Sequence, residues 1–255
     1  MKRKLIRGCV CFLLVILFII SAGCFMQDVS EYHSVKNKYS DIHDKAKKGR
    51  TIDWNRLHNI NPNIVAWIEI PKTKVDYPIV QTRNNAEYLT KDIYGKYSRY
   101  GSIFLDERLY GTVWGTVPNN IVYGHNMGRW TNVMFGPLKE YLAGDYLKEH
   151  ETILIYTPEK TYRYKIASVE YGTSSSSVYE TEFEDINFSE WVNEQTHNSL
   201  YQCLSEKKIS GYVNKFTDKN LSKNIVKYGN TLTLSTCDTT HNNNKKICIF
   251  CIPEM

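Results

Sequence analysis

The sequence carries little net charge outside its first seven residues. The 255-residue chain has a formal charge of +5 at pH 7, and the four basic residues among the first seven supply all but one of these charges. A nucleic-acid-binding protein needs a clustered basic face, so the rest of the chain does not fit a nucleic-acid partner. We interpret the basic run from Lys45 to Arg50 as the solvated end of a helix, where it could face an anionic membrane surface.

The sequence also lacks the ligand spacing of a structural metal site. Cys248 and Cys251 form a close pair, but no second ligand pair with metal spacing accompanies them. On a strand these two side chains face opposite sides, which disfavours a disulfide between them. An even number of cysteines follows the N-terminal apolar stretch and permits disulfides in an exported protein, but a domain of about 200 residues does not need them. We expect no metal and no cofactor, and we interpret Cys203, Cys248 and Cys251 as small core residues.

Charge is absent from the twenty residues between Gly8 and Gln27. About twenty apolar residues span a bilayer, and the basic residues before them place the N-terminus inside and the remainder outside. We therefore predict a cytoplasmic segment over 1–7, a single-pass transmembrane signal anchor over 8–27, an extracellular helical stalk over 28–50 and one exported domain over 51–255. A cleaved signal peptide is the main alternative. Lipidation at Cys24 is another, although Ser21-Ala-Gly-Cys24 matches a lipobox poorly.

Short apolar or alternating runs recur along the exported part, with turn residues between them. Such runs are typical of strands, and their number favours a closed or nearly closed barrel, so we expect a mainly β fold. They cover 64–70, 75–80, 101–105, 120–124, 152–157, 161–171, 230–236 and 246–252. Helical patterns are fewer: a short capped helix begins near Thr51 and ends near Asn61, a second covers 135–142, and a longer one covers 188–204. The apolar stripe of the longest, which includes Trp191 and Val192, indicates core packing.

Cys237 ends the run Asn230-Thr-Leu-Thr-Leu-Ser-Thr-Cys237. A strand end is a rigid mount, and Leu232 and Leu234 would anchor the strand in the core while the thiol faces a groove. A nucleophilic role fits this placement. A core cysteine is the alternative, since free cysteine is among the most buried residue types. A cysteine nucleophile also needs a histidine that is remote in sequence and near in space.

His125 occupies a matching position in Asn120-Ile-Val-Tyr-Gly-His-Asn-Met127, where an apolar run ends at Gly124. Glycine there lets the backbone turn or approach another strand closely. The other six histidines lie in charged or polar stretches, where a solvated surface role fits each of them. His241 is the only rival because it closely follows Cys237, but its setting Thr-Thr-His-Asn-Asn-Asn is typical of a turn. We therefore expect His125 to pair with the Cys237 thiol.

With these two motifs the chain resembles a known family. Thr233-Leu-Ser-Thr-Cys237 and Tyr123-Gly-His-Asn-Met127 are similar to the signature pair of the sortases, the cysteine transpeptidases of Gram-positive bacteria. Further segments are similar to class B sortases in order and spacing, and the resemblance extends from about residue 51 to residue 252. These segments are Asn63-Ile-Val-Ala-Trp-Ile-Glu-Ile-Pro71, Val75-Asp-Tyr-Pro-Ile-Val-Gln81, Asn85-Ala-Glu-Tyr-Leu89 and Gly101-Ser-Ile-Phe-Leu-Asp106.

The resemblance implies an eight-stranded sortase barrel with N-terminal helices and a long helix between the sixth and seventh strands. It implies that Cys237 is the nucleophile and that His125 moves protons. It further implies a peptide groove lined by Asn85, Leu89 and Ser235. Without the resemblance, these last three residues are equally well interpreted as a turn amide, a core leucine and a strand hydroxyl.

The chain departs from the family at one position. Sortases carry an arginine on the strand after the nucleophile strand, but no arginine follows Arg163 here. Lys246 takes the expected position, with Lys245 as the alternative. A guanidinium is a planar fork that holds two acceptors at once, whereas an ammonium is a point charge on a flexible stem. Lys246 can still stabilise an oxyanion; the competing view is that Arg163 or Arg83 folds into the site.

We therefore predict a cysteine transpeptidase that cleaves a C-terminal sorting motif, of the Asn-Pro-x-Thr type, through a thioacyl intermediate. The acceptor would be an amine of a peptidoglycan precursor, which explains a catalytic domain held on the extracellular side of the cell membrane. A secreted cysteine protease is one alternative, because it shares the Cys and the His but hydrolyses its substrate. A catalytically impaired sortase-like binding protein is another, and the missing arginine is its supporting feature.

Overall fold

The computed structural model describes residues 2–128, 131–172, 176–182, 190–192, 194–195, 230–237 and 246–254. By contacts the chain divides into two compact units, Met1–Asp44 and Lys45–Met255. Most of the helix expected over 188–204 lies outside the described residues, as does Cys203. Within that range, residues 190–192 and 194–195 are helical.

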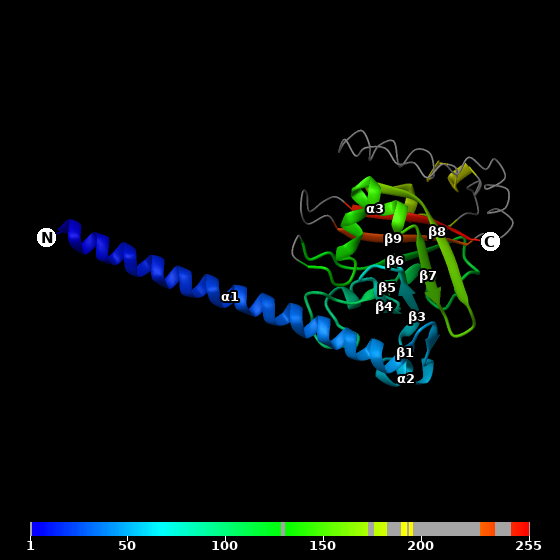
Figure 1. The fold of residues 1–255 in the computed structure, drawn as a ribbon, viewed down its shortest axis with the longest axis horizontal. Coiled ribbons are helices and arrows are strands. Elements are labelled where there is room, and N and C mark those ends of the chain that lie inside the picture. Colours follow the sequence, from blue (N-terminus) through cyan, green and yellow to red (C-terminus); the bar gives the residue numbers. More distant parts are fainter. Residues whose placement is uncertain are drawn as a thin grey trace. The chain divides into compact units, whose positions relative to one another are not determined.

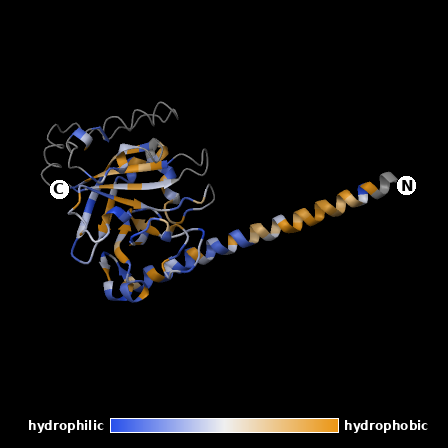
Figure 2. Ribbon diagram, turned by 180° about the vertical axis from the view of Figure 1, so that it is seen from behind, coloured by the Kyte–Doolittle hydropathy of each residue, from blue (hydrophilic) through white to orange (hydrophobic). Residues whose placement is uncertain are grey.

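The N-terminal unit consists of helix α1, which covers Lys2–Ala46 and continues into the second unit. Its first half is apolar and its second half is polar (Figure 2). In the part of the chain that the structure describes, α1 is the one helix long and apolar enough to cross a membrane, judged by length and composition. A helical conformation is thus found both for the predicted anchor and for most of the predicted stalk.

The second unit is built around a closed eight-stranded barrel with the strand order β10-β8-β7-β3-β4-β5-β6-β9 (Figure 1). Two neighbouring pairs, β4 with β5 and β6 with β9, are parallel, and the other pairs are antiparallel. The mainly β prediction and the eight-stranded barrel are confirmed. The strands are β3 (Ile64–Glu69), β4 (Asp76–Val80), β5 (Ile103–Leu105), β6 (Asn119–Tyr123), β7 (Thr152–Tyr156), β8 (Thr161–Gly172), β9 (Thr231–Cys237) and β10 (Lys246–Pro253).

Short helices connect the strands. The side chain of Asp53 accepts a hydrogen bond from Arg56 N at 3.0 Å and caps α2, as expected for a helix that ends before Asn61. The segment predicted as a helix over 135–142 is a 3-10 helix, η3. The described helices of this unit with assigned bounds are α2 (Trp54–Ile60), η1 (Glu87–Leu89), η2 (Glu107–Leu109), η3 (Gly136–Leu142), α3 (Gly144–Glu149) and η4 (Ser177–Tyr179).

The basic run before the barrel differs from the prediction of a solvated helix end. After Ala46 the chain forms a small antiparallel pair, β1 (Lys47–Lys48) with β2 (Thr51–Ile52). The Lys47 side chain is only 3% exposed, and its Nζ lies 2.6 Å from both Glu69 Oε2 and Asp76 Oδ1. A buried ammonium needs such partners. The solvated interpretation is therefore wrong for Lys47, because carboxylates from β3 and β4 neutralise it.

Strand β9 has two differently covered faces. Leu232 and Leu234 are fully buried, as expected for the residues that anchor the strand. Thr233 and Ser235, on the opposite face, contact η4 and its flanks through hydrogen bonds. On the neighbouring β10, Cys248 belongs to an outer apolar cluster with Trp191, and Cys251 is also buried. The prediction that Cys248 and Cys251 are core residues is confirmed.

Candidate active site

His125 and Cys237 follow equivalent positions on two adjacent parallel strands. Tyr123 on β6 pairs with Ser235 on β9, and Gly124 N donates a hydrogen bond to Ser235 O at 3.2 Å. Each candidate residue comes two positions later, so the backbone brings both to the same end of the barrel. The side chain of Cys237 and residues 238–245, which include His241 and Lys245, lie outside the described residues. The sulfur-to-imidazole distance therefore stays a prediction.

The imidazole of His125 is held through one of its nitrogens. Its Nε2 lies 2.8 Å from Leu89 O, and because a carbonyl can only accept, Nε2 carries the proton. Burial lowers the pKa of His125, the hydrogen bond to Leu89 raises it, and the nearby charge of Lys246 lowers it again, with a net decrease. These surroundings favour the neutral imidazole, in which Nδ1 is the nitrogen that can take up a proton.

Two glycines allow His125 to sit where it does. Gly101 has φ +54°, and a Cβ there would lie 2.4 Å from Tyr88 O and 3.0 Å from His125 Cδ2. A Cβ on Gly124 would lie 2.7 Å from the ring of Phe135, whose backbone N donates to His125 O at 3.0 Å. The close approach expected at Gly124 is thus to an aromatic side chain. Sequence reasoning missed the role of Gly101, although its segment had been noted for its resemblance to class B sortases.

Lys246 begins β10 and is the direct Cα partner of Cys237. Opposite residues of an antiparallel pair project to the same face of the sheet. The side chain of Lys246 is half-buried, and its charge acts on His125. The two arginines considered as substitutes have other partners: Arg163 pairs with Glu254, and the guanidinium of Arg83 lies 4.7 Å from the ring centre of Tyr110. This placement favours Lys246 over either arginine.

The three residues expected in a peptide groove lie in different settings. Leu89 is 40% exposed and contributes the carbonyl that holds His125. Asn85 makes a reciprocal pair with Glu107, in which Asn85 Oδ1 accepts from Glu107 N at 2.8 Å and Asn85 N donates to Glu107 Oε2 at 3.0 Å. Ser235 is buried, and its Oγ lies 2.7 Å from Tyr179 Oη. The structure therefore brings Leu89 to His125, and it covers Ser235 with a tyrosine that sequence reasoning did not single out.

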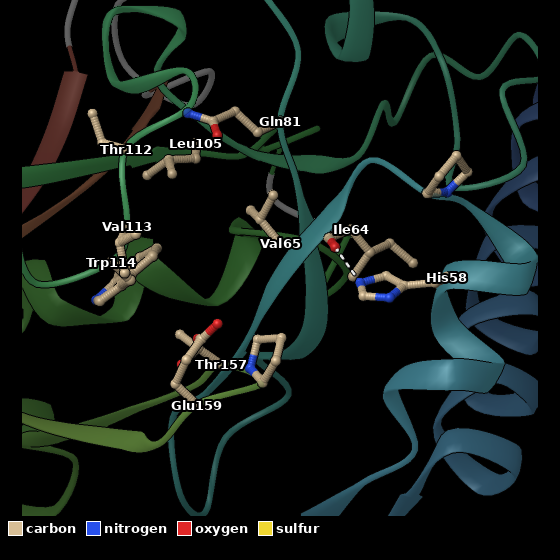
Figure 3. Close-up of a pocket in the computed structure, with 12 residues that line it drawn as sticks. His58, Ile64, Val65, Gln81, Leu105, Thr112, Val113, Trp114, Thr157 and Glu159 are labelled. Carbon is tan, nitrogen blue, oxygen red and sulfur yellow. Dashed lines mark hydrogen bonds between the residues drawn. The ribbon is translucent and has the colours of Figure 1, made fainter.

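A surface cavity of about 320 Å³ lies elsewhere on the barrel (Figure 3). It is lined by the start of β3, the end of β5 and the turn after β7, whereas His125 lies near Gly101, before β5 begins. His58, which points toward β3 in Figure 3, is engaged with Ile64 O at 3.0 Å. The described residues that line this cavity include no cysteine. It is therefore distinct from the site around His125.

Comparison with known proteins identifies similar chains and a matching family. The family model of the sortase domain matches residues 68–254. The chain is similar to sortase B of Staphylococcus aureus, with 27% identity over 96% of this chain and 95% of that protein. It is similar to sortase B of Listeria monocytogenes, with 34% identity over 72% of this chain and 66% of that protein. A solved Staphylococcus aureus sortase B–substrate complex superposes with a TM-score of 0.62 at 25% identity, over 88% of this chain and 92% of the other.

Proposed function

This chain belongs to the sortase family, in class B, and we propose that it joins exported proteins to a peptidoglycan amine after cutting a sorting motif of the Asn-Pro-x-Thr type. Family membership makes it a cysteine transpeptidase. The observation that carries the proposed site is the strand register. β9 pairs with both β6 and β10. His125 follows the end of β6 by two residues, Cys237 ends β9 and Lys246 begins β10. Three groups suited to acyl transfer thus come from adjacent strands.

In the first step Cys237 would attack the carbonyl carbon of the motif's threonine. The thiol proton would pass to Nδ1 of His125, and the new carbon–sulfur bond would give a tetrahedral oxyanion. Collapse of this intermediate would break the peptide bond while His125 returns the proton to the leaving amine. The lowered pKa of His125 supports this order, because a neutral imidazole accepts the thiol proton and then becomes an acid strong enough to release it.

In the second step an amine of a peptidoglycan precursor would attack the thioacyl carbon. His125 would take the proton of the amine, an amide would form, and the Cys237 thiolate would leave. The proton on His125 would then return to this thiolate and restore the starting thiol. Lys246 would stabilise the oxyanion of both steps through its positive charge. Its position opposite Cys237 supports this role.

The partners follow from the same chemistry. A sortase B relative is known in complex with a substrate, which supports a sorting-signal peptide as the donor here. We propose that Leu89, Ser235 and Asn85 border the groove for this peptide. The apolar part of α1 supports a single-pass anchor in the cell membrane, with 28–50 as stalk and 51–255 as catalytic domain outside.

One observation favours a second candidate function. Lysine stands where sortases carry arginine, and it cannot hold two acceptors in a fixed fork. The protein would then bind sorting peptides without turning them over efficiently. A cysteine protease is the remaining alternative.

Product analysis separates these candidates. The full chain in detergent would be incubated with Asn-Pro-x-Thr-type peptides, with and without an amine acceptor, and the products identified by mass spectrometry. A transpeptidase gives a new amide that requires the acceptor, whereas a protease gives the same hydrolysis product in both mixtures. Peptide binding without either product would favour the impaired protein and contradict the proposal.

A further inference from the structure

We propose that Asp106, acting through Arg108 and Tyr123, is a positioning residue that holds residues 176–180 against β9 and thereby sets the affinity for the sorting peptide. This inference rests on the proposed function, since it concerns the wall of the same peptide groove. Residues 176–180 contain η4 and are called the η4 segment below.

The η4 segment lies on the face of β9 that carries Ser235. Tyr179 Oη lies 2.7 Å from Ser235 Oγ and 3.0 Å from Cys248 Sγ on β10. On β6, Asn119 Nδ2 donates to Val178 O at 3.0 Å and to Glu180 O at 2.9 Å. Ser235 lies two positions before Cys237 along the backbone of β9. Tyr179 therefore covers Ser235, two residues before the proposed nucleophile along β9.

Asp106 is a buried carboxylate with three kinds of donor. It is 1% exposed, and Arg108 Nε and Nη2 each lie 3.0 Å from one of its oxygens in a two-pronged ion pair. Arg108 N adds a bond of 2.9 Å, and Tyr123 Oη donates to Oδ2 at 2.7 Å. Burial raises the pKa of Asp106, but the hydrogen bonds from Arg108 and Tyr123 lower it to below its usual value. The hydrogen bonds from Arg108 and Tyr123 thus favour the ionised carboxylate of Asp106.

Both side chains that donate to Asp106 also contact Tyr179. Arg108 Nη2 donates to Tyr179 O at 3.1 Å. The ring of Tyr123 stacks on the ring of Tyr179, with centroids 6.3 Å apart and planes 12° from parallel. One carboxylate therefore orients a backbone contact and a ring contact to the same tyrosine. Without its charge, Arg108 and Tyr123 lose a shared anchor, and the η4 segment loses two of its supports.

The position of this network predicts which kinetic constant changes. Asp106 lies at the end of β5 and contacts neither His125 nor Lys246 in any described hydrogen bond, so proton transfer at the nucleophile should not depend on it. The position of the η4 segment against Ser235, which forms the wall of the proposed groove, should depend on Asp106. Loss of Asp106's charge is therefore expected to weaken peptide binding and to spare the chemical step.

The test compares Asp106→Asn and Tyr123→Phe with a matched control, Asp76→Asn. Asp76 also accepts hydrogen bonds from a cation, Lys47, and from an aromatic donor, Trp67 Nε1 at 2.5 Å. It lies on β4, however, and β5 and β6 separate this strand from β9.

We expect Asp106→Asn to raise KM for the peptide about tenfold or more, because a charge-assisted network is lost. Tyr123→Phe keeps the ring and should raise KM about threefold. Neither kcat nor the rate at which iodoacetamide alkylates Cys237 should change more than about twofold.

Hydrogen exchange gives a readout that does not require turnover. The backbone amides of the η4 segment should exchange faster in Asp106→Asn than in the wild type, and at the wild-type rate in Asp76→Asn. Equal exchange and equal KM in folded Asp106→Asn would overturn the inference, as would an equal loss of kcat and of alkylation rate. If the wild type turns over no peptide, the proposed function fails, and the exchange comparison alone decides whether Asp106 positions the segment.

Discussion

Lys246 lies directly opposite Cys237 in the antiparallel pairing of β9 with β10. His125 follows β6, on the other side of β9. Burial is the main cause of its lowered pKa, and the charge of Lys246 lowers that pKa further. Lys246 is thus paired through its backbone with one candidate residue, and its charge acts on the other. A positive charge stabilises an oxyanion and disfavours a protonated imidazole nearby. Lys246 should therefore affect both the acylation rate and the pKa of His125, and each effect can be measured separately.

The first consequence concerns acylation. Lys246→Ala should lower the acylation rate about 100-fold to 1,000-fold, as expected when one oxyanion contact is lost. Lys246→Arg should keep or raise the rate, since a guanidinium can engage two acceptors. Single-turnover kinetics of the three proteins measure this directly. Equal rates for the wild type and Lys246→Ala would mean that another residue holds the oxyanion, and inactivity of all three would favour the impaired binding protein.

The second consequence concerns His125 itself. A neighbouring positive charge disfavours the imidazolium, so Lys246→Met should raise the pKa of His125, whereas Lys246→Arg should leave it near the wild-type value. NMR titration of the ring protons of His125 measures the shift. A pKa that does not move in Lys246→Met, in a protein with an unchanged spectrum elsewhere, would show that the ammonium points away from the imidazole.

Gly101 provides a test of how His125 is held. Gly101→Ala puts a methyl group 2.4 Å from Tyr88 O and 2.7 Å from Leu89 O, the carbonyl that binds His125. We expect a loss of activity and a loss of about 1–3 kcal/mol of stability from overpacking, in addition to about 1–2 kcal/mol from the left-handed backbone.

Gly95→Ala is the matched control for this substitution. Gly95 has φ +74°, with nothing within 4 Å of an added Cβ, so it should show only the backbone cost and keep full activity. Denaturant unfolding and peptide turnover measure both effects. Equal behaviour of the two variants would mean that the carbonyl of Leu89 does not position His125.

The nucleophile and the base can be removed separately. Cys237→Ala and His125→Ala should each abolish cleavage and transfer, because acyl transfer needs both the sulfur and the proton carrier. Their thermal unfolding transitions should stay close to that of the wild type. Retained turnover in either variant would remove the Cys/His mechanism.

The sequence predicts the barrel and the ends of its strands well, because both depend on local patterns. The alternation of Thr231 to Cys237 marks β9, and the glycine after Tyr123 marks the end of β6. A parallel pairing of these two strands is enough to bring Cys237 and His125 to the same end of the barrel. The places of Cys237 and His125 at strand ends were therefore predictable from local patterns, whereas the pairing that brings the two ends together is a tertiary contact.

Features that depend on partners distant in sequence were not predictable in the same way. Lys47 belongs to a basic run that looks solvated, and only Glu69 and Asp76 explain its burial. Tyr179 follows a run of serines with no periodic pattern, yet it covers Ser235 because Arg108 and Tyr123 hold it there. The setting of Gly101 depends on Tyr88, Leu89 and His125 meeting at one point. No local pattern carries that information.

In the proposed reaction Cys237 carries the acyl group from the donor peptide to the acceptor amine. The most direct measurement is mass spectrometry of the intact enzyme, mixed rapidly with sorting peptide, followed by digestion to locate the adduct. We expect a mass increase on Cys237 equal to the peptide fragment that ends in threonine less one water. This adduct should disappear when an amine is added, and the fragment should then be found as an amide product. Absence of an adduct while peptide is consumed, or an adduct on another cysteine, would contradict this role of Cys237.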